Sequence, residues 1–296
     1  MALLKKGIEE KCRVLVLANP ESKRLNRIPK SDCVTVIPCG IDEYKSLDAD
    51  KLLNELGLER IDVFYHLSWA GTFGEARNDM ELQNKNVDYT LDALRLAGRL
   101  KCECFVGVGS QAEYGRVQGE LRADTPTNPE NGYGIKKLEA GIRSRQLAGE
   151  LGIRHIWARV LSIYGPYDGA ATMVMSTIDK LINGIEPELT QGEQLWDYLY
   201  SEDAAEALFR LGEKGVDGRI YPIGSGIARP LKDYIEIIGS IVNPKVSLGF
   251  GKRPYADNQV MYLKADISEL QADTGFAAKT EFADGIRSIL SVHYNR

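Results

Sequence analysis

Residues 104–115 read CFVGVGSQAEYG, and this stretch decides the fold. Its first five residues form a short apolar run of the length that a buried strand in a parallel sheet needs. The run ends at Gly109-Ser110, and parallel sheets place their ligands at the carboxyl ends of their strands. The hydroxyl of Ser110 can both donate and accept hydrogen bonds at that position. The alternative is that Ser110 only satisfies backbone groups in a turn, as most loop serines do.

Strand-like and helix-like segments alternate on both sides of this run. Apolar runs predict strands over 13–18, 34–37, 62–67 and 155–163, and helical spacing predicts helices over 47–56, 80–100 and 131–151. Such alternation predicts an α/β fold with a doubly wound parallel sheet covered by helices on both faces.

The pattern changes after Tyr164-Gly165-Pro166, where glycines and prolines become frequent. We expect residues 1–165 to form a first domain, to which residues 191–223 return, and residues 166–190 and 224–296 to form a smaller, more irregular α/β domain. Within this second half, helices are predicted over 201–211, 231–242 and 282–290, and a strand over 219–223.

Composition limits the class of protein. The chain has 37 Lys and Arg residues against 42 Asp and Glu, a formal net charge of −5, which argues against nucleic acid as a partner because phosphate contacts need clustered cations. No apolar run approaches the roughly 20 residues of a membrane span, and the N-terminus lacks the apolar core of a signal peptide. The five cysteines form no C-x-x-C pair, and no second ligand accompanies His66. We therefore expect a cytoplasmic protein with reduced thiols, no metal site and no membrane partner.

Tyr133 and Lys137 lie four residues apart in a predicted helix, so both side chains share one face. An ammonium within about 4–6 Å favours the phenolate and lowers the pKa of a tyrosine from its usual value near 10. Such a pair can act as a general acid or base near neutral pH. The spacing alone is also compatible with an ordinary solvated helix face.

Seven segments carry motif-like patterns, namely residues 63–69 (VFYHLSW), 86–90 (NVDYT), 110–115 (SQAEYG), 133–137 (YGIKK), 159–166 (RVLSIYGP), 194–203 (QLWDYLYSED) and 221–226 (YPIGSG). Together and in this order they resemble motifs of the extended short-chain dehydrogenase/reductase family, in its branch that acts on nucleotide-linked sugars. The resemblance implies a Rossmann-like dinucleotide-binding domain over 1–165 and a substrate-binding second domain.

The resemblance also implies roles. Tyr133 would be the acid/base, Lys137 would hold the nicotinamide ribose and tune Tyr133, and Ser110 would bind the reacting sugar oxygen. The cofactor would be NADP or NAD, the substrate a nucleotide-diphosphate sugar, and the assembly a homodimer. The family's 4,6-dehydratases carry an Asp-Glu pair where this chain has Gln111 and Ala112, so the closer resemblance is to 4-ketoreductases such as the abequose- and paratose-forming enzymes.

Two alternatives stay open, a nucleotide-sugar 4-epimerase and a non-catalytic remnant that binds a nucleotide-sugar or a partner. Net consumption of NADPH separates a reductase from an epimerase, which returns the hydride to the same cofactor.

Further binding residues are predicted at strand ends and in the second domain. Lys23 and Arg24 could hold the 2′-phosphate of NADP, although Glu21 opposes this and a solvated charged turn fits equally well. The cofactor set is Asn19, Ser22, Lys23, Arg24, Ile41, Leu67, Ser68, Tyr133 and Lys137. The substrate set is Gln111, Trp196, Tyr198 and Arg253, although core packing is an equal alternative for the two aromatic residues.

The N-terminus departs from the family. Members open with a strand and a Gly-x-x-Gly-x-x-Gly turn whose helix binds the pyrophosphate, whereas residues 1–10 (MALLKKGIEE) look like the second half of that helix. Gly107-x-Gly109 has part of the spacing but leads into no helix. A truncated chain, a misassigned start or a loss of cofactor binding would each explain the difference. We expect a sheet that lacks its first strand, marginal stability and poor dinucleotide binding.

Overall fold

The computed structural model describes residues 1–294. The helices are α1 (Ala2–Glu9), α2 (Ala49–Leu56), α3 (Met80–Arg99), α4 (Gly132–Leu151), α5 (Met173–Ile182), α6 (Ser201–Lys214), α7 (Leu231–Val242), α8 (Ser268–Thr274) and α9 (Phe282–Tyr294). The strands are β1 (Val14–Ala18), β2 (Val34–Pro38), β3 (Val63–His66), β4 (Cys104–Ser110), β5 (Arg154–Val160), β6 (Ser162–Tyr164), β7 (Leu195–Trp196), β8 (Tyr198–Tyr200), β9 (Ile220–Ile223), β10 (Arg229–Pro230) and β11 (Tyr262–Leu263).

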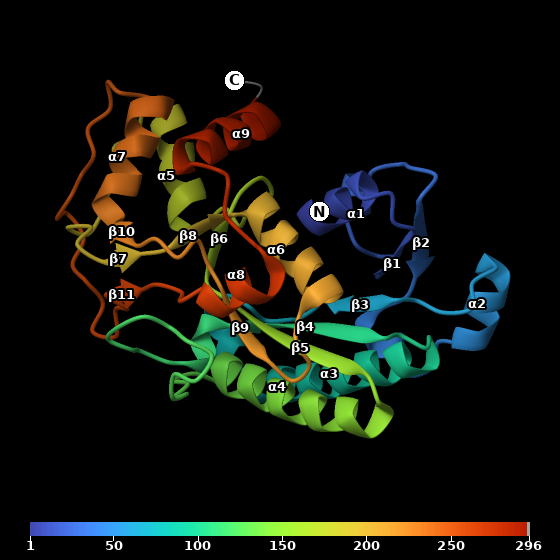
Figure 1. Ribbon diagram of the computed structural model, residues 1–296. Coiled ribbons are helices and arrows are strands. Elements are labelled where there is room, and N and C mark those ends of the chain that lie inside the picture. The colour runs from blue at the N-terminus through green and yellow to red at the C-terminus, as the bar shows by residue number, and fades with distance from the viewer. Residues whose placement is uncertain (295–296) are drawn as a thin grey trace.

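The main sheet has four parallel strands in the order β3-β4-β5-β9. Helices α3 and α4 cover one face and α6 covers the other, as Figure 1 shows. Strand β4 is buried along nearly its whole length, which explains why its sequence is a continuous apolar run rather than an alternating one. The prediction of an α/β fold with a Rossmann-like parallel sheet is confirmed.

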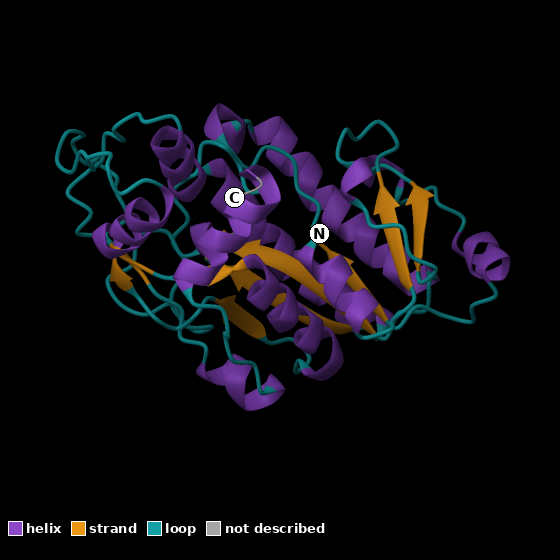
Figure 2. Cartoon of the chain, turned by 90° about the horizontal axis from the view of Figure 1, so that it is seen from above, coloured by secondary structure: helices purple, strands orange, loops and turns teal. Residues whose placement is uncertain are grey.

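Strands β1 and β2 form a separate parallel pair (Figure 2). Leu17 of β1 and Phe64 of β3 pack against the same hydrophobic cluster, so the two sheets lie side by side without hydrogen bonds between them. Within residues 1–294, no strand pairs with the free edge of β1 or with that of β3. The division of the sheet agrees with the prediction that it lacks one strand in its middle.

Local signals explain where the helices begin and end. The side chains of Asp48, Asp79 and Asn131 cap the N-termini of α2, α3 and α4 by accepting backbone N–H bonds. Gly57 and Gly152 end α2 and α4 in the left-handed region that glycine adopts without strain. The predicted ends of α2, α3 and α4 therefore lie within two residues of the observed ones.

The strand predicted over 155–163 is two strands. Strand β5 pairs with β4 and β9, whereas β6 leaves that sheet after Leu161 and pairs with β8. The apolar character of the segment is continuous because both strands are largely buried, although against different partners. The hydrophobic pattern therefore contained no sign of the break.

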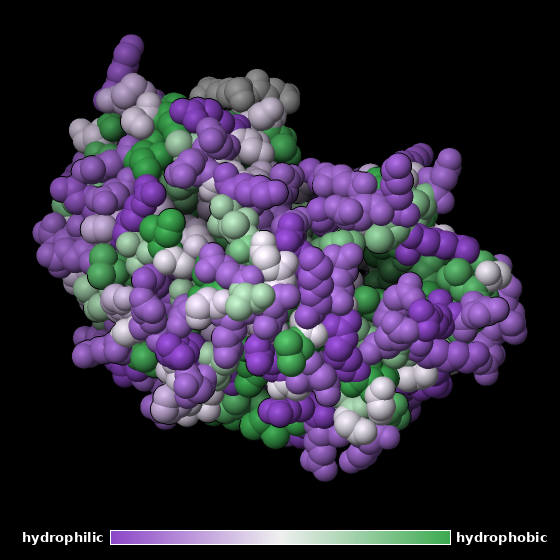
Figure 3. Space-filling view, viewed as in Figure 1, coloured by the Kyte–Doolittle hydropathy of each residue, from purple (hydrophilic) through white to green (hydrophobic). Residues whose placement is uncertain are grey.

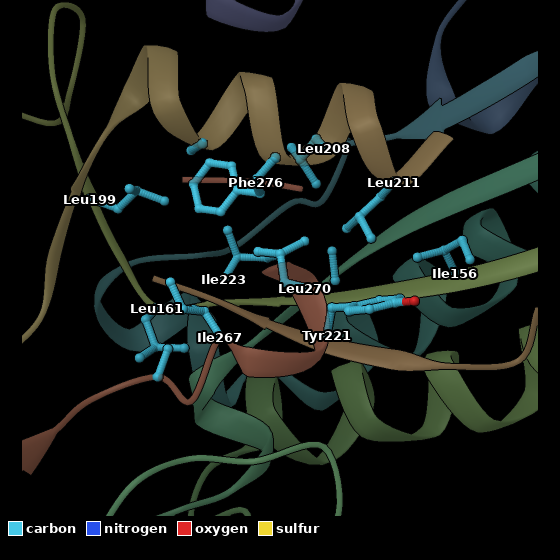
Figure 4. Packing of buried hydrophobic residues seen from close by; sticks show 14 of the residues in the cluster. Ile156, Leu161, Leu199, Leu208, Leu211, Tyr221, Ile223, Ile267, Leu270 and Phe276 are labelled. Atoms are coloured by element: carbon cyan, nitrogen blue, oxygen red, sulfur yellow. The ribbon is translucent and has the colours of Figure 1, made fainter. Parts of the chain in front are cut away.

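The largest hydrophobic cluster lies between the main sheet, α6 and α8. Figure 4 shows its side chains, with Leu208 and Leu211 of α6 above Ile156, Tyr221 and Ile223 of the sheet. A second, aromatic cluster joins α5, α7 and α9 around Phe282. On the face seen in Figure 3, hydrophilic residues predominate and apolar ones are scattered among them. No helix in residues 1–294 is long and apolar enough to cross a membrane.

Candidate active site

Ser110 is the last residue of β4, at the carboxyl edge of the main sheet. Its side chain opens a short helical turn, η4 (Gln111–Glu113), and its hydroxyl accepts the N–H of Ala112 at 3.2 Å. Only 9% of the residue is exposed. The turn thus fixes the serine hydroxyl at the strand end.

Tyr133 lies in the first turn of α4, beside Ser110. Asn131 caps this helix through the N–H of Gly134, and Asn78 accepts the N–H of Gly132 at 3.0 Å, so the segment is held from two sides. Burial raises the pKa of Tyr133 above its usual value, and the Ser110 hydroxyl and the Arg77 guanidinium oppose this. The phenol is therefore protonated at neutral pH, which suits a proton donor.

Lys137 lies one helical turn further along α4 and is 4% exposed. Its Nζ donates to the carbonyl of Val108 in β4 at 2.6 Å and lies 3.9 Å from the ring centroid of Trp69. Burial lowers the pKa of Lys137 to about 7, and Glu113 acts in the opposite direction. The predicted group of Ser110, Tyr133 and Lys137 thus meets at the end of β4.

Two more side chains enclose Tyr133, and the sequence interpretation missed both. The indole of Trp69 meets the Tyr133 ring edge-on with centroids 6.1 Å apart, and the guanidinium of Arg77 lies 4.5 Å from the centroid of that ring. Trp69 is held by a 2.8 Å bond from its Nε1 to Gln83. The only available signal for Trp69 was its place just after a predicted strand; Arg77 carried none.

A family model for the NAD dependent epimerase/dehydratase family matches residues 1–224. The chain belongs to this family. Ser110, Tyr133 and Lys137, which were identified from the motifs of such a family, therefore lie in a chain that belongs to it.

The relatives found by sequence are about 25% identical to this chain, and a solved structure has the same fold. The chain is 25% identical over 244 residues to an uncharacterised protein of Methanocaldococcus jannaschii, covering 81% of this chain and 74% of that protein. It is 25% identical over 260 residues to a trifunctional UDP-glucose 4,6-dehydratase/UDP-4-keto-6-deoxy-D-glucose 3,5-epimerase/UDP-4-keto-L-rhamnose-reductase of Arabidopsis thaliana, of whose length it spans 37%, while 82% of this chain is covered. A UDP-N-acetylglucosamine 4-epimerase of Methanobrevibacter ruminantium has the same fold, with a TM-score of 0.84, 17% identity and coverage of 98% and 94% of the two chains.

The residues predicted to hold the cofactor follow three strands. Asn19 and Ser22 follow β1, and their side chains accept the backbone N–H groups of Glu21 and Arg24, so they order this turn. The other members are Lys23 and Arg24, both exposed, Ile41 after β2, and Leu67 and Ser68 after β3. Leu67 is 51% exposed next to the Ser68 hydroxyl. An uncovered apolar side chain beside a hydroxyl at a strand end fits the flat ring and the ribose of a dinucleotide.

Of the predicted substrate residues, only Gln111 lies next to Ser110, in η4. Trp196 donates from its Nε1 to the Ser162 hydroxyl at 2.8 Å, and Tyr198 packs against Tyr234 with ring centroids 5.1 Å apart. Arg253 is exposed in the loop after α7. Trp196 and Tyr198 therefore make contacts within the protein, as the core-packing alternative expected. That Trp196, Tyr198 and Arg253 contact a substrate stays a prediction.

A separate hollow lies beside β2. It measures about 540 Å³ and is lined by residues of 25–36, including Leu25, Ile28, Val34 and Val36 beside β2. No predicted site residue lines it. The candidate site therefore rests on its chemical groups rather than on cavity size.

Proposed function

We propose that the chain is an oxidoreductase that reduces the 4-keto group of a nucleotide-activated sugar with a nicotinamide cofactor. Membership of the NAD dependent epimerase/dehydratase family supports the reaction class. The position of Ser110 and Tyr133 side by side at the carboxyl edge of β4 supports the site, because ligands of parallel sheets bind at this edge.

The proposal rests on the hydrogen bonding of Glu113, the one carboxylate in residues 110–114. Glu113 has no exposed surface. Its Oε1 accepts the N–H groups of Ser110 and of the Trp157 indole, and its Oε2 accepts Nε of Arg159. Gln111 and Ala112 cannot transfer protons either. Proton transfer next to Ser110 is therefore left to Tyr133, which suffices to reduce a ketone but not to eliminate water.

The cofactor would lie along the ends of β1, β2 and β3 and, when bound in its reduced form, supply a hydride to the carbonyl carbon. Tyr133 donates its proton to the carbonyl oxygen as that oxygen gains negative charge. Ser110 donates a hydrogen bond to the same oxygen and stabilises the charge. The Lys137 ammonium stabilises the phenolate left on Tyr133. Since the Trp69 ring covers that ammonium, contact between Lys137 and a ribose requires the indole to move.

A nucleotide-sugar 4-epimerase is the second candidate. The same three side chains serve both directions of hydride transfer, and a solved structure with this fold is a 4-epimerase. The raised pKa of Tyr133, which burial causes, favours the reductive direction, because the residue starts as a proton donor. A homodimeric state and the division into a dinucleotide domain and a substrate domain remain part of the proposal.

The test is a reduction assay with a nucleoside diphosphate 4-keto-6-deoxy sugar. Consumption of one NADPH or NADH per product indicates a reductase, whereas inversion of a 4-hydroxy nucleotide-sugar at C4 without net consumption of cofactor, assayed in parallel, indicates an epimerase. Tyr133→Phe should lower turnover at least ~100-fold, the low end for loss of a general acid, and should change substrate affinity much less.

Tyr65→Phe is the matched control, because the Tyr65 hydroxyl is also partly buried but donates to the carbonyl of Phe209, on α6. It should retain wild-type turnover. A Tyr133→Phe variant as active as the wild type would refute the assignment.

A further inference from the structure

A buried network lies beneath the Ser110 turn, and the reaction described above does not use it. One oxygen of Glu113 accepts the N–H of Ser110 at 2.8 Å, and the other accepts Nε of Arg159 at 2.6 Å. The indole N–H of Trp157 bonds to the same carboxylate at 3.1 and 3.2 Å. Glu113 thus ties the backbone of Ser110 to two side chains of β5.

The glycines around Trp157 show that this network is built tightly into the fold. A Cβ at Gly107 would lie 2.5 Å from the indole, and one at Gly141 would lie 2.8 Å from it. A Cβ at Gly109 would lie 2.4 Å from both the Glu113 carboxylate and the Trp157 Nε1. Glycine is therefore required at positions 107 and 109 because an indole and a carboxylate approach β4 closely there.

Stability alone is a weak reason for such a pair. Glu113 and Arg159 are both buried, and replacing a buried ion pair by apolar residues is often neutral or stabilising. Arg159 also stacks on the ring of Tyr114 at 4.5 Å, so its position is specified from two sides. The arrangement therefore points to a role in the site rather than in the core.

Direct contact of Glu113 with a substrate is excluded by the space available. The cavity beside it measures about 60 Å³ and is lined by Trp157, Arg159 and residues of α4. That volume holds one or two waters but no sugar. Any effect of Glu113 on the reaction must pass through the groups it touches or faces.

We propose that Glu113 is a positioning residue, which holds the backbone of Ser110 and supplies the negative charge facing Lys137. The inference rests on the proposed function, because it concerns the same three side chains. The carboxylate binds one cation, Arg159, and its charge acts at longer range on a second, Lys137.

The charged and titratable groups around Lys137 come from four elements besides its own helix. His66 of β3, Glu113 of η4 and Tyr133 of α4 interact with Lys137, whereas Arg77 of η3 (Gly74–Asn78) lies on the Tyr133 ring and Arg159 of β5 binds Glu113. Glu113 is the one anion in this set. Loss of its charge should lower the pKa of Lys137 further, and loss of the Arg159 charge should raise it.

The experiment measures the pKa of Lys137 directly, by NMR titration of lysine Cε signals in labelled protein, with Lys137→Arg to assign the resonance. Glu113→Gln should move the pKa down from about 7 by roughly one unit. Arg159→Gln should move it up by roughly half a unit, because it removes a positive charge that is bound to the same carboxylate. A purely structural role would not produce shifts of opposite sign, and either variant tests the idea if the other fails to fold.

Glu113→Asp separates the two parts of the role, because it keeps the charge but shortens the reach to Ser110. The pKa of Lys137 should stay near 7, while amide hydrogen exchange at Ser110 should accelerate at least ~10-fold. Asp197→Asn is the control, a buried carboxylate that binds the loop at Ser225 instead. It should change neither signal.

Unchanged Lys137 titration in folded Glu113→Gln, or shifts of the same sign in both charge variants, would overturn the inference. Because no readout needs turnover, this result is independent of the Tyr133→Phe assay. Failure of the proposed function and failure of the positioning role are therefore distinguishable.

Discussion

The two buried histidines should make this protein sensitive to mild acid. His66 and His155 are 4% and 2% exposed. His155 stacks between the rings of Phe105 and Trp157 at 5.9 and 6.1 Å, and its Nε2 lies 2.9 Å from the Ser144 hydroxyl. Thr90 donates its hydroxyl to the carbonyl of Asn86, so His66 must donate from Nε2 to Thr90. The Nδ1 of His66 has no hydrogen-bond partner among residues 1–294. Both rings are held in the neutral form.

The magnitude follows from the two pKa values. Burial lowers the pKa of His66 from 6.5 to about 3 and that of His155 from 6.5 to about 4. Below pH 6.5 the unfolded chain binds these protons and the folded chain does not, so stability is lost as the pH falls toward the folded values. At about 1.36 kcal/mol per pKa unit, the two residues together should remove about 5 kcal/mol between about pH 7.5 and pH 4.5, roughly half from each.

The assay is urea denaturation across this pH range, together with NMR titration of the histidine Cε1–H signals. The chain has only three histidines, so each signal can be assigned by substitution. His155→Gln should reduce the loss of unfolding free energy at about pH 4.5 by about 2.5 kcal/mol, because a neutral amide cannot take up the proton. Tyr65→Phe, which removes no group that titrates in this pH range, is the control and should leave the pH dependence unchanged. Equal stability at both pH values, or a His155 signal that titrates near 6.5, would refute the reasoning.

Two further predictions concern the cofactor and the fold. If Lys23 and Arg24 meet a 2′-phosphate, NADPH should bind more tightly than NADH, and the difference should shrink with added salt, because exposed charge contacts are screened. Equal affinity in a low-salt titration would contradict this. Asp197→Ala should lower the free energy of unfolding by at least about 3 kcal/mol in urea, because it leaves the buried N–H of Ala265 and the part-buried N–H groups of Ser225 and Gly226 without their acceptor, at about 1–3 kcal/mol each. A loss below about 1 kcal/mol would show that water replaces the carboxylate.

Local pattern was sufficient for strands β3 and β4, for helices α2, α3 and α4, and for the places of the three central side chains, but not for the break between β5 and β6. A continuous apolar run indicates a strand that is buried on both faces, and its end marks where ligands bind, so Ser110 could be placed from residues 104–110 alone. Tyr133 and Lys137 could be placed on one helix face because helical periodicity is fixed by the backbone. The division between β1 and β3 also followed from the sequence, because a parallel sheet in this order needs a strand that residues 1–294 do not contain.

Contacts between distant segments could not be predicted in this way. Trp69 and Arg77 reach Tyr133 across more than fifty residues, and Glu113 meets Arg159 from two separate strand ends. The spacing of residues along the chain carries no information about such pairs, because each depends on how two elements pack. Packing also decided the partners of Tyr198, since an aromatic side chain suits a ligand pocket and a core equally well. Sequence thus determined which chemical groups stand at the sheet's carboxyl edge, and tertiary structure decided which charges and rings surround them.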